Sequence, residues 1–361
     1  MTEAEILKAL SNVINPDQKK DIVSLGMVTD IKIHDNNISL TIGVPMASAP
    51  YKDTINAQSE EAIKKLYNDE NINVHVTFTS KTTSGRTSAP TVLPKVKNII
   101  AVVSGKGGVG KSTVASNLAL ALAQKGATVG LMDADIYGPS APIMFGVRGE
   151  RPRMIDVDGK GKILPLEKYG IKLMSIGLLV DERQAVVWRG PMVSSAIRQF
   201  VTDVFWDELD YLVIDMPPGT GDIHLTLMQL VPVTGVVIVT TPQDVALADA
   251  KKGIAMFGQA QLHVPIIGLV ENMAYFTPAE LPENKYYIFG KEGGKRLASE
   301  YDLHFLGQIP LVQSIREGGD KGVPAMLGDD EISKKAFEQF AEETAKQIAE
   351  QNARNTIHVK L

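Results

Sequence analysis

A glycine-rich segment at 105–112 restricts this chain more than any other feature of its sequence. It reads Gly-Lys-Gly-Gly-Val-Gly-Lys-Ser and follows a continuous apolar run, NIIAVVS, at 98–104. A helical pattern of apolar residues begins directly after it, at 113–124. Continuous apolar runs are typical of strands that a parallel sheet buries on both faces. The segment therefore predicts a strand, a tight glycine loop and a helix in direct succession.

The chain beyond residue 98 repeats this alternation of strand and helix. Four more apolar runs predict buried strands, at 129–133, 211–215, 236–240 and 266–270. Helical patterns occur at 191–205, 245–259 and 331–353, and a short inserted hairpin is expected within 150–170. Strands and helices that alternate at this spacing predict an α/β fold with a doubly wound, mostly parallel sheet.

Residues 1–80 predict a separate, small α+β domain. Its expected elements are a helix at 3–14, a hairpin of strands at 27–34 and 38–44, a helix at 53–67 and a strand at 72–79. A stretch rich in Ser, Thr, Gly and Pro follows, which is typical of an exposed linker. The expected boundaries are 1–80 for the small domain, 81–97 for the linker, 98–353 for the larger domain and 354–361 for a C-terminal tail.

Composition narrows the classes of function. The formal net charge is −5, whereas a surface for nucleic acid needs clustered Lys and Arg, so no nucleic-acid partner is expected. We find no apolar stretch of about 18 residues or more and no signal-peptide pattern, and therefore expect a cytoplasmic protein without membrane insertion. The chain has no cysteine, which excludes a disulfide, a thiol nucleophile and a thiolate ligand.

The glycine segment matches G-x-x-x-x-G-K-[ST], the P-loop pattern for binding nucleotide phosphates. Its glycines let backbone N–H groups converge on phosphate oxygens, and the following helix directs its positive end toward them. Lys111 is expected to neutralise β- and γ-phosphate charge, and Ser112 to ligate Mg²⁺. The predicted ATP-binding residues of the loop are Gly105, Lys106, Gly107, Gly108, Val109, Gly110, Lys111, Ser112 and Thr113.

Acidic residues at two predicted strand ends fit the same site. The run Tyr-Leu-Val-Ile-Asp has the Walker B form and places Asp215 at the carboxyl end of a central strand, where open α/β sheets bind ligands. Asp133 and Asp135 follow another strand in the same way. We expect Asp133 and Asp215 to support the Mg²⁺ shell and Asp135 to orient the attacking water. The loop after Asp215 offers the N–H of Gly219 to the γ-phosphate.

Lys106 gives the loop a resemblance to one class of P-loop ATPases. A P-loop needs no lysine at its second position, and a cation there reaches the phosphates of its own chain or of a partner, as an arginine finger does. The sequence KGGVGKST at 106–113 resembles the deviant Walker A motif of MinD, ParA, the nitrogenase iron protein and the Mrp/ApbC iron–sulfur carriers. We predict Lys106, Lys111 and Asp135 as the catalytic residues.

Further motifs, spread over essentially the whole chain, resemble the Mrp/ApbC group in particular. They are DADIYGPS at 133–140, WRGPM at 188–192, DMPPGTGD at 215–222, ENM at 271–273 and IFG at 288–290, while DIVSLGM at 21–27 resembles a small domain related to SufT/PaaD. The resemblance implies an ATPase that forms a homodimer, with Lys106 acting across the interface. It also implies that Asn272 contacts adenine and that Pro310 packs on the base. Members of the family bind a bridging iron–sulfur cluster and deliver it to apoproteins.

One part of the family pattern is missing from this chain. The family's cluster ligands form a C-x-x-C between Glu-Asn-Met and Ile-Phe-Gly, and that interval, 274–287, has no cysteine here. The Cys-Pro that the small domain often carries is Ala49-Pro50. The histidines show no ligand spacing; they are His34, His75, His224, His263, His304 and His358. The resemblance therefore implies a cluster for which the chain supplies no thiolate.

Three functions stay open at this point. The first is an Mrp-type ATPase in iron–sulfur cluster assembly or transfer, which uses the thiols of an apoprotein or assembly partner or acts as a nucleotide-driven scaffold. The second is a MinD/ParA-like switch that recruits a protein without a cluster. The third is a nucleotide-dependent enzyme acting on a small molecule. The C-terminal helix lacks the basic face that binds membranes, and we find no basic patch for DNA, which weakens the second alternative.

Overall fold

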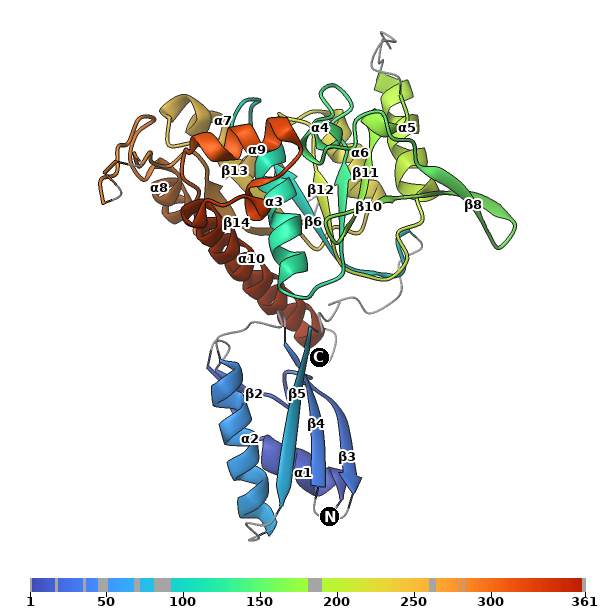
Figure 1. Ribbon diagram of the computed structural model, residues 1–361, viewed down its shortest axis with the longest axis vertical. Coiled ribbons are helices and arrows are strands. Elements are labelled where there is room, and N and C mark those ends of the chain that lie inside the picture. The colour runs from blue at the N-terminus through green and yellow to red at the C-terminus, as the bar shows by residue number, and fades with distance from the viewer. Residues whose placement is uncertain are drawn as a thin grey trace. The chain divides into compact units, whose positions relative to one another are not determined.

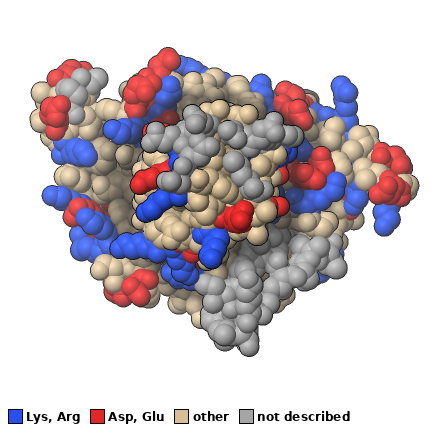
Figure 2. Space-filling model, turned by 90° about the horizontal axis from the view of Figure 1, so that it is seen from below, with Lys and Arg blue, Asp and Glu red and all other residues tan. Residues whose placement is uncertain are grey.

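The computed structural model describes residues 2–16, 19–34, 37–44, 51–67, 72–80, 92–180, 190–259, 264–278, 280–281 and 283–358. The chain divides into two compact units. One contains residues 1–87 with the short stretches 125–127 and 349–361, and the other contains 88–124 and 128–348. Ala49-Pro50, His263 and most of the predicted linker lie outside the described residues. On the face drawn in Figure 2, basic and acidic side chains both occur, with several Lys and Arg together along its left edge.

The small unit is a three-stranded sheet packed with two helices (Figure 1). In the sheet, β4 lies between β3, which is antiparallel to it, and β5, which is parallel. Alternate residues of β4, Ile38, Leu40 and Ile42, are buried against apolar side chains of both helices, as a half-buried strand requires. The elements are α1 (Glu3–Leu10), β1 (Ile14–Asn15), β2 (Lys20–Asp21), β3 (Val28–His34), β4 (Asn37–Val44), α2 (Lys52–Tyr67) and β5 (Asn73–Ser80).

The helix predicted at 3–14 is four residues too long. A capping box of Thr2 and Glu5 begins α1, and the helix ends at Leu10. After Leu10 the backbone N–H groups of Asn12 and Val13 donate to carbonyls only three residues back, those of Ala9 and Leu10, at 3.1 and 3.0 Å, so the last turn tightens and the helix ends. Ile14, expected on the helix, pairs with Asp21 in a short antiparallel ladder instead.

The large unit is built on an eight-stranded sheet, which confirms the predicted α/β class. The strand order is β10-β11-β7-β12-β6-β13-β14-β15, and every neighbouring pair is parallel except β10 and β11. From β6 the chain adds β7, β10 and β11 on one side, returns to place β12 between β7 and β6, and then adds β13, β14 and β15 on the other side, so the sheet is doubly wound. The strands are β6 (Val96–Val103), β7 (Val129–Asp133), β10 (Leu166–Lys168), β11 (Ile171–Ser175), β12 (Leu209–Asp215), β13 (Gly235–Thr240), β14 (Ile266–Glu271) and β15 (Phe305–Gln308).

Helices cover both faces of this sheet. Successive residues of a strand point to opposite faces, and every residue of β12 is buried, so both faces are covered. Figure 1 shows α3 and α10 in front of the sheet. The helices are α3 (Lys111–Gln124), α4 (Ala141–Met144), η1 (Ile176–Leu178), α5 (Gly190–Asp203), α6 (Asp222–Leu230), α7 (Asp244–Phe257), α8 (Gly293–Glu300), α9 (Gln313–Lys321), η2 (Ala325–Leu327) and α10 (Glu331–His358). No helix within the described ranges is long and apolar enough to span a bilayer.

Of two predictions outside the large sheet, the inserted hairpin is confirmed and the C-terminal tail is wrong in part. The hairpin expected within 150–170 is confirmed as β8 (Arg153–Val157) and β9 (Lys160–Leu164), an antiparallel pair outside the large sheet. The tail expected at 354–361 is wrong in part, because α10 continues to His358. The residues Arg-Asn-Thr-Ile-His that extend it include neither glycine nor proline, so nothing in the local sequence ends the helix.

Candidate functional site

The glycine segment forms a tight loop between β6 and α3, as predicted. Gly108 and Gly110 have φ angles of 84° and 79°, which other residues rarely adopt. Close packing also requires glycine: a Cβ at Gly105 would lie 2.2 Å from the backbone of Asp249 in α7. The hydroxyl of Ser104 donates to the carbonyl of Lys106 at 2.9 Å and closes the start of the loop. These features fix the position of the loop that leads into the N-terminus of α3.

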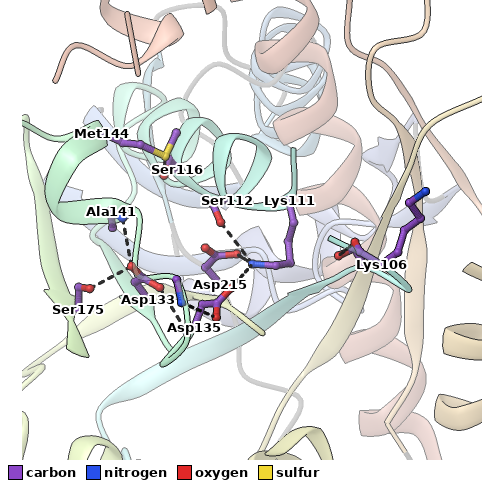
Figure 3. Close-up of polar contacts among 12 residues, drawn as sticks. Lys106, Lys111, Ser112, Ser116, Asp133, Asp135, Ala141, Met144, Ser175 and Asp215 are labelled. Atoms are coloured by element: carbon purple, nitrogen blue, oxygen red, sulfur yellow. Dashed lines mark hydrogen bonds and ion pairs between the residues drawn. The ribbon is translucent and has the colours of Figure 1, made fainter. Parts of the chain in front are cut away.

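Lys111 lies at the centre of a buried charge cluster (Figure 3). Its side chain is 6% exposed, and the ammonium makes a short ion pair with Asp215 at the end of β12. The same ammonium lies 4.0 Å from a carboxylate oxygen of Asp135 and 3.3 Å from the hydroxyl of Ser112. Strands β6, β7 and β12 are neighbours, so their carboxyl ends bring the loop and the acids together.

Asp133 is fully buried beside this cluster. One carboxylate oxygen accepts from the N–H of Ala141 at 3.1 Å and from the hydroxyl of Ser175 at 2.9 Å; the other accepts from the N–H of Asp135 at 3.2 Å. Burial, followed by the charge of Asp215, raises the pKa of Asp133 to about 7. Burial also raises the pKa of Asp215, against the opposing charge of Lys111. The two carboxyl groups therefore lie close together in the interior, where a nearby cation stabilises their ionised forms.

The donor set fits Mg²⁺ held together with a nucleotide. The hydroxyl of Ser112 is a hard oxygen ligand of the kind that Mg²⁺ prefers, and the carboxylates of Asp133 and Asp215 are acceptors for water in the Mg²⁺ shell. Within the part of the chain that the structure describes, no group of three or more His, Asp or Glu side chains is arranged to hold a metal ion alone. That arrangement suits a site in which phosphates complete the coordination, because Mg²⁺ is commonly bound by few protein groups and the substrate phosphates.

The other predicted site residues surround the cluster at different distances from it. The N–H of Gly219 donates to the carbonyl of Ser104 at 2.9 Å, with φ of 92°. Asn272 is buried, and its amide donates to the carbonyl of Val109 at 2.8 Å, so it touches the P-loop backbone. Pro310 is buried just beyond β15. Lys106 is partly exposed, and Figure 3 shows its side chain pointing away from Lys111 and the acids.

Two buried residues at this edge were not predicted. Ser175 supports Asp133 from β11, a strand that has no strong apolar run of its own in the sequence. Glu271 ends β14 and accepts from the N–H of Gly294 in α8 and, at 2.7 Å, from the side chain of Gln308. The position of Glu271 at the end of an apolar run is a sequence signal for a residue at this edge of the sheet. Its hydrogen-bond partners lie more than 20 residues away, so the sequence does not reveal them.

The interval that lacks cysteine follows β14 and is largely exposed. Phe276 and Tyr286 pair through two backbone hydrogen bonds of 2.8 Å and so form a small antiparallel bridge. The ammonium of Lys285 lies 4.0 Å from the ring centroid of Tyr275. Apolar side chains at its distal end face solvent, including Tyr286 and Ile288, which is 59% exposed. Iron–sulfur clusters are held by cysteine and in some cases histidine, and the interval has neither, so it does not fit such a cluster.

Comparison with known proteins identifies the family. Residues 95–348 match the family described as NUBPL iron-transfer P-loop NTPase, and residues 3–79 match the iron–sulfur cluster assembly protein family. The chain is 45% identical to an iron–sulfur cluster carrier protein of Synechocystis, over 97% of this chain and 98% of that protein. It is 42% identical to an Escherichia coli protein of the same name, over 96% of this chain and 92% of that protein.

A solved structure is also similar to this chain. The nucleotide-binding protein of Archaeoglobus fulgidus, determined in complex with ADP, is 40% identical, with a TM-score of 0.55 over 64% of this chain and 88% of that one. The predicted resemblance to the Mrp/ApbC carriers is thus confirmed. Because the family match covers most of its length and a close relative covers nearly all of it, this chain belongs to the NUBPL iron-transfer family of P-loop NTPases, with an N-terminal iron–sulfur cluster assembly domain.

Proposed function

We propose that this P-loop NTPase hydrolyses ATP with Mg²⁺ and uses the cycle to drive transfer of iron–sulfur clusters to apoproteins. The observation that carries the ATPase proposal is the convergence of Lys111, Ser112 and Asp215 at the N-terminus of α3. Phosphoryl transfer needs positioned cations and Mg²⁺ ligands more than covalent chemistry, and these groups provide both. The names of the relatives support the cluster-transfer part.

Lys111 has to exchange partners when ATP binds. Its ammonium is paired with Asp215 in this structure. A phosphate that took the ammonium would release the Asp215 carboxylate, which would be free to hold a water bound to Mg²⁺. Mg²⁺ neutralises the charge that develops on the transferred phosphoryl group. The ion pair therefore holds the Lys111 and Asp215 side chains in place until ATP and Mg²⁺ provide each of them with a new partner.

Asp135 orients the attacking water in this proposal. Its carboxylate is buried next to Lys111, and one oxygen accepts from the N–H of Gly138 at 3.2 Å, which fixes the carboxylate at the mouth of the loop after β7. We expect Asp135→Asn to lower kcat by about 100-fold or more, since the water loses its acceptor, with ATP affinity retained. Single-turnover phosphate release measures this. Asp158→Asn, in the exposed turn of the β8–β9 hairpin, is the matched control, and an equal kcat for both variants would remove Asp135 from the mechanism.

The proposed assembly is a homodimer in which Lys106 reaches the phosphates of the partner. Its side chain points away from the acids of its own chain, as an interaction in trans requires. Asn272 and Pro310 are proposed to contact the base. The amide of Asn272 is bound to the P-loop carbonyl of Val109, so a contact with adenine links the base pocket to the phosphate loop.

The iron–sulfur cluster is a cargo whose thiolate ligands come from another protein. The chain has no cysteine, and the interval after β14 offers none of the usual ligands. The test is anaerobic reconstitution with iron and sulfide, followed by desalting and analysis of both. We expect the isolated chain to retain no stoichiometric cluster. With an apoprotein present, wild-type protein should accelerate cluster insertion in ATP, while Lys111→Ala should not. Retention by the isolated chain, or equal insertion by both proteins, contradicts the proposal.

The alternative of a partner-recruiting switch without a cluster is not favoured. Both family matches and the relatives concern iron or iron–sulfur clusters. The same insertion assay separates the two functions, because a switch without cargo forms ATP-dependent complexes but leaves the rate of cluster insertion unchanged.

A further inference from the structure

His224 is a buried histidine whose ring lacks good hydrogen bonds. It lies in the first turn of α6 and is 1% exposed. Within the described part of the chain, neither ring nitrogen has a hydrogen-bond partner of acceptable geometry. Buried polar groups in native proteins are almost always paired, so an unpaired imidazole in the interior calls for an explanation. A second arrangement of the surrounding backbone, in which the ring is paired, provides one.

The ring lies beneath the loop that joins β12 to α6. The carbonyls of Pro217 and Gly221, near the two ends of this loop, act on the imidazole and favour its protonated form. Burial is the larger effect and lowers the pKa of His224, so the ring is neutral at pH 7. A neutral imidazole has one N–H donor and one acceptor nitrogen. The ring N–H of His224 therefore lies near two loop carbonyls but forms a well-aligned hydrogen bond with neither.

The loop is held to β6 and to the residue that follows it by two backbone hydrogen bonds. The N–H of Met216 donates to Val102 at 3.1 Å, and the N–H of Gly219 donates to Ser104 at 2.9 Å. Gly219 is the residue whose N–H is proposed to meet the γ-phosphate. That N–H cannot point at both Ser104 and a phosphate oxygen, so the peptide must turn, and the carbonyls on either side of it move with it. Only ATP, and not ADP, supplies the γ-phosphate that drives this turn.

We propose that His224 is a positioning residue that stabilises the loop in its ATP-bound arrangement, by donating a ring N–H to a loop carbonyl that the turn of Gly219 brings into line. The residue acts through the loop and does not touch the phosphates. A hydrogen bond that forms in only one of two arrangements adds to the affinity of the ligand that selects that arrangement. His224 thus contributes to discrimination between ATP and ADP. The inference rests on the proposed ATPase function.

The test compares ATP and ADP affinities of three variants of the full chain. His224→Leu removes the donor, His224→Gln keeps an N–H donor, and Leu227→Met changes a buried residue of the same helix without a polar group. Dissociation constants for ADP and for a non-hydrolysable ATP analogue are measured by calorimetry with Mg²⁺. We expect the Leu variant to lose about fivefold or more of the preference for the ATP analogue, with ADP affinity unchanged. The Gln variant should recover most of the preference, and the Met variant should retain it.

Two outcomes overturn the inference. One is an unchanged preference in the Leu variant; the other is an equal loss of affinity for both nucleotides, which indicates a packing role alone. If the Leu variant does not fold, as judged by its melting transition, the Gln variant is compared with an Asn variant, whose amide lies on a shorter side chain. An equal fall in the preference for the ATP analogue in both variants contradicts the positioning role. A wild-type protein that binds neither nucleotide would instead overturn the proposed ATPase function, so the two failures are distinguishable.

Discussion

Two sets of loops at the same edge of the eight-stranded sheet are built in opposite ways. The loops after β6, β7 and β12 bury a lysine and three carboxylates, which are joined by ion pairs and hydrogen bonds. The loop after β14 exposes aromatic and aliphatic side chains, and its sequence has no cysteine. The difference agrees with the proposal that this chain supplies the groups for nucleotide chemistry while another protein supplies the ligands of the iron–sulfur cluster.

Lys111→Ala tests the buried side of this comparison most severely. We expect ATP turnover to fall by about 1,000-fold or more, because both phosphate charge and Asp215 lose their counter-charge. Phosphate release at saturating Mg-ATP measures the effect. Lys252→Ala, an exposed lysine paired with Asp249 on α7, is the control and should turn over ATP normally. If turnover by Lys111→Ala stayed within tenfold of wild type, the buried charges around Lys111 would stabilise the fold without taking part in hydrolysis.

Lys106→Ala tests whether the site is complete in one chain. We expect turnover to fall by about 100-fold, since a cation that stabilises transition-state charge in trans is lost. Mixing this variant with Lys111→Ala should restore activity, because a mixed dimer contains one intact composite site. Fully active Lys106→Ala together with mixtures that recover nothing would place Lys106 outside the mechanism.

Asp133→Asn tests how the buried acids affect stability. The pKa of Asp133 is raised to about 7 in the folded chain, against 3.8 for the free group, so the folded state binds more protons between these values. Its contribution to stability is therefore fully present at low pH and is lost as the pH rises toward 7, with a slope of at most about 1.4 kcal/mol per pH unit.

The measurement is urea unfolding of the nucleotide-free protein from pH 4.5 to 8. The decline in unfolding free energy should be weaker in Asp133→Asn, which cannot ionise, than in the wild type. Asp158→Asn, at an exposed turn, should leave the decline unchanged. Parallel pH profiles for wild type and Asp133→Asn would show that this carboxyl does not titrate in that range.

Ile288→Ser tests the exposed side and should have the smallest effect. Its side chain is 59% exposed, so we expect a change in unfolding free energy of less than about 0.5 kcal/mol and unchanged ATP turnover. Thermal unfolding and phosphate release measure both. A fivefold loss of turnover would show that the loop after β14 takes part in hydrolysis and would end the separation of the two regions.

Local pattern was sufficient for most of the large unit. Strand β7 has the predicted bounds, and β12 and β14 differ from prediction only at their ends, because long apolar runs have no alternative to burial in a parallel sheet. The small unit was harder: α1 ends in a tightened turn whose N–H groups bond three residues back, and apolar spacing does not reveal such a change.

For the site, sequence motifs located Lys111, Asp133, Asp135 and Asp215 because motif residues at strand ends converge in this fold. The contacts of Ser175 with Asp133 and of Asn272 with Val109 join segments 42 and 163 residues apart, and no local pattern specifies such pairs. The roles of all the predicted site residues, including Lys106, Asn272 and Pro310, stay predictions. The structure adds that Lys106 points away from the buried acids and that Asn272 is bound to the P-loop.

The sequence by itself determined that this chain binds nucleotide phosphates in a doubly wound sheet and that it supplies no thiolate for a cluster. Glycines, a lysine and strand-end acids at fixed spacings are local requirements of that chemistry, and the absence of cysteine needs no structure to interpret. The tertiary structure alone decided how the charges are satisfied: Lys111 pairs with Asp215, Asp133 is buried with a raised pKa, and His224 lies unpaired beneath the loop that carries Gly219. Burial and partner geometry arise when distant segments pack, so the sequence specifies them only through the fold.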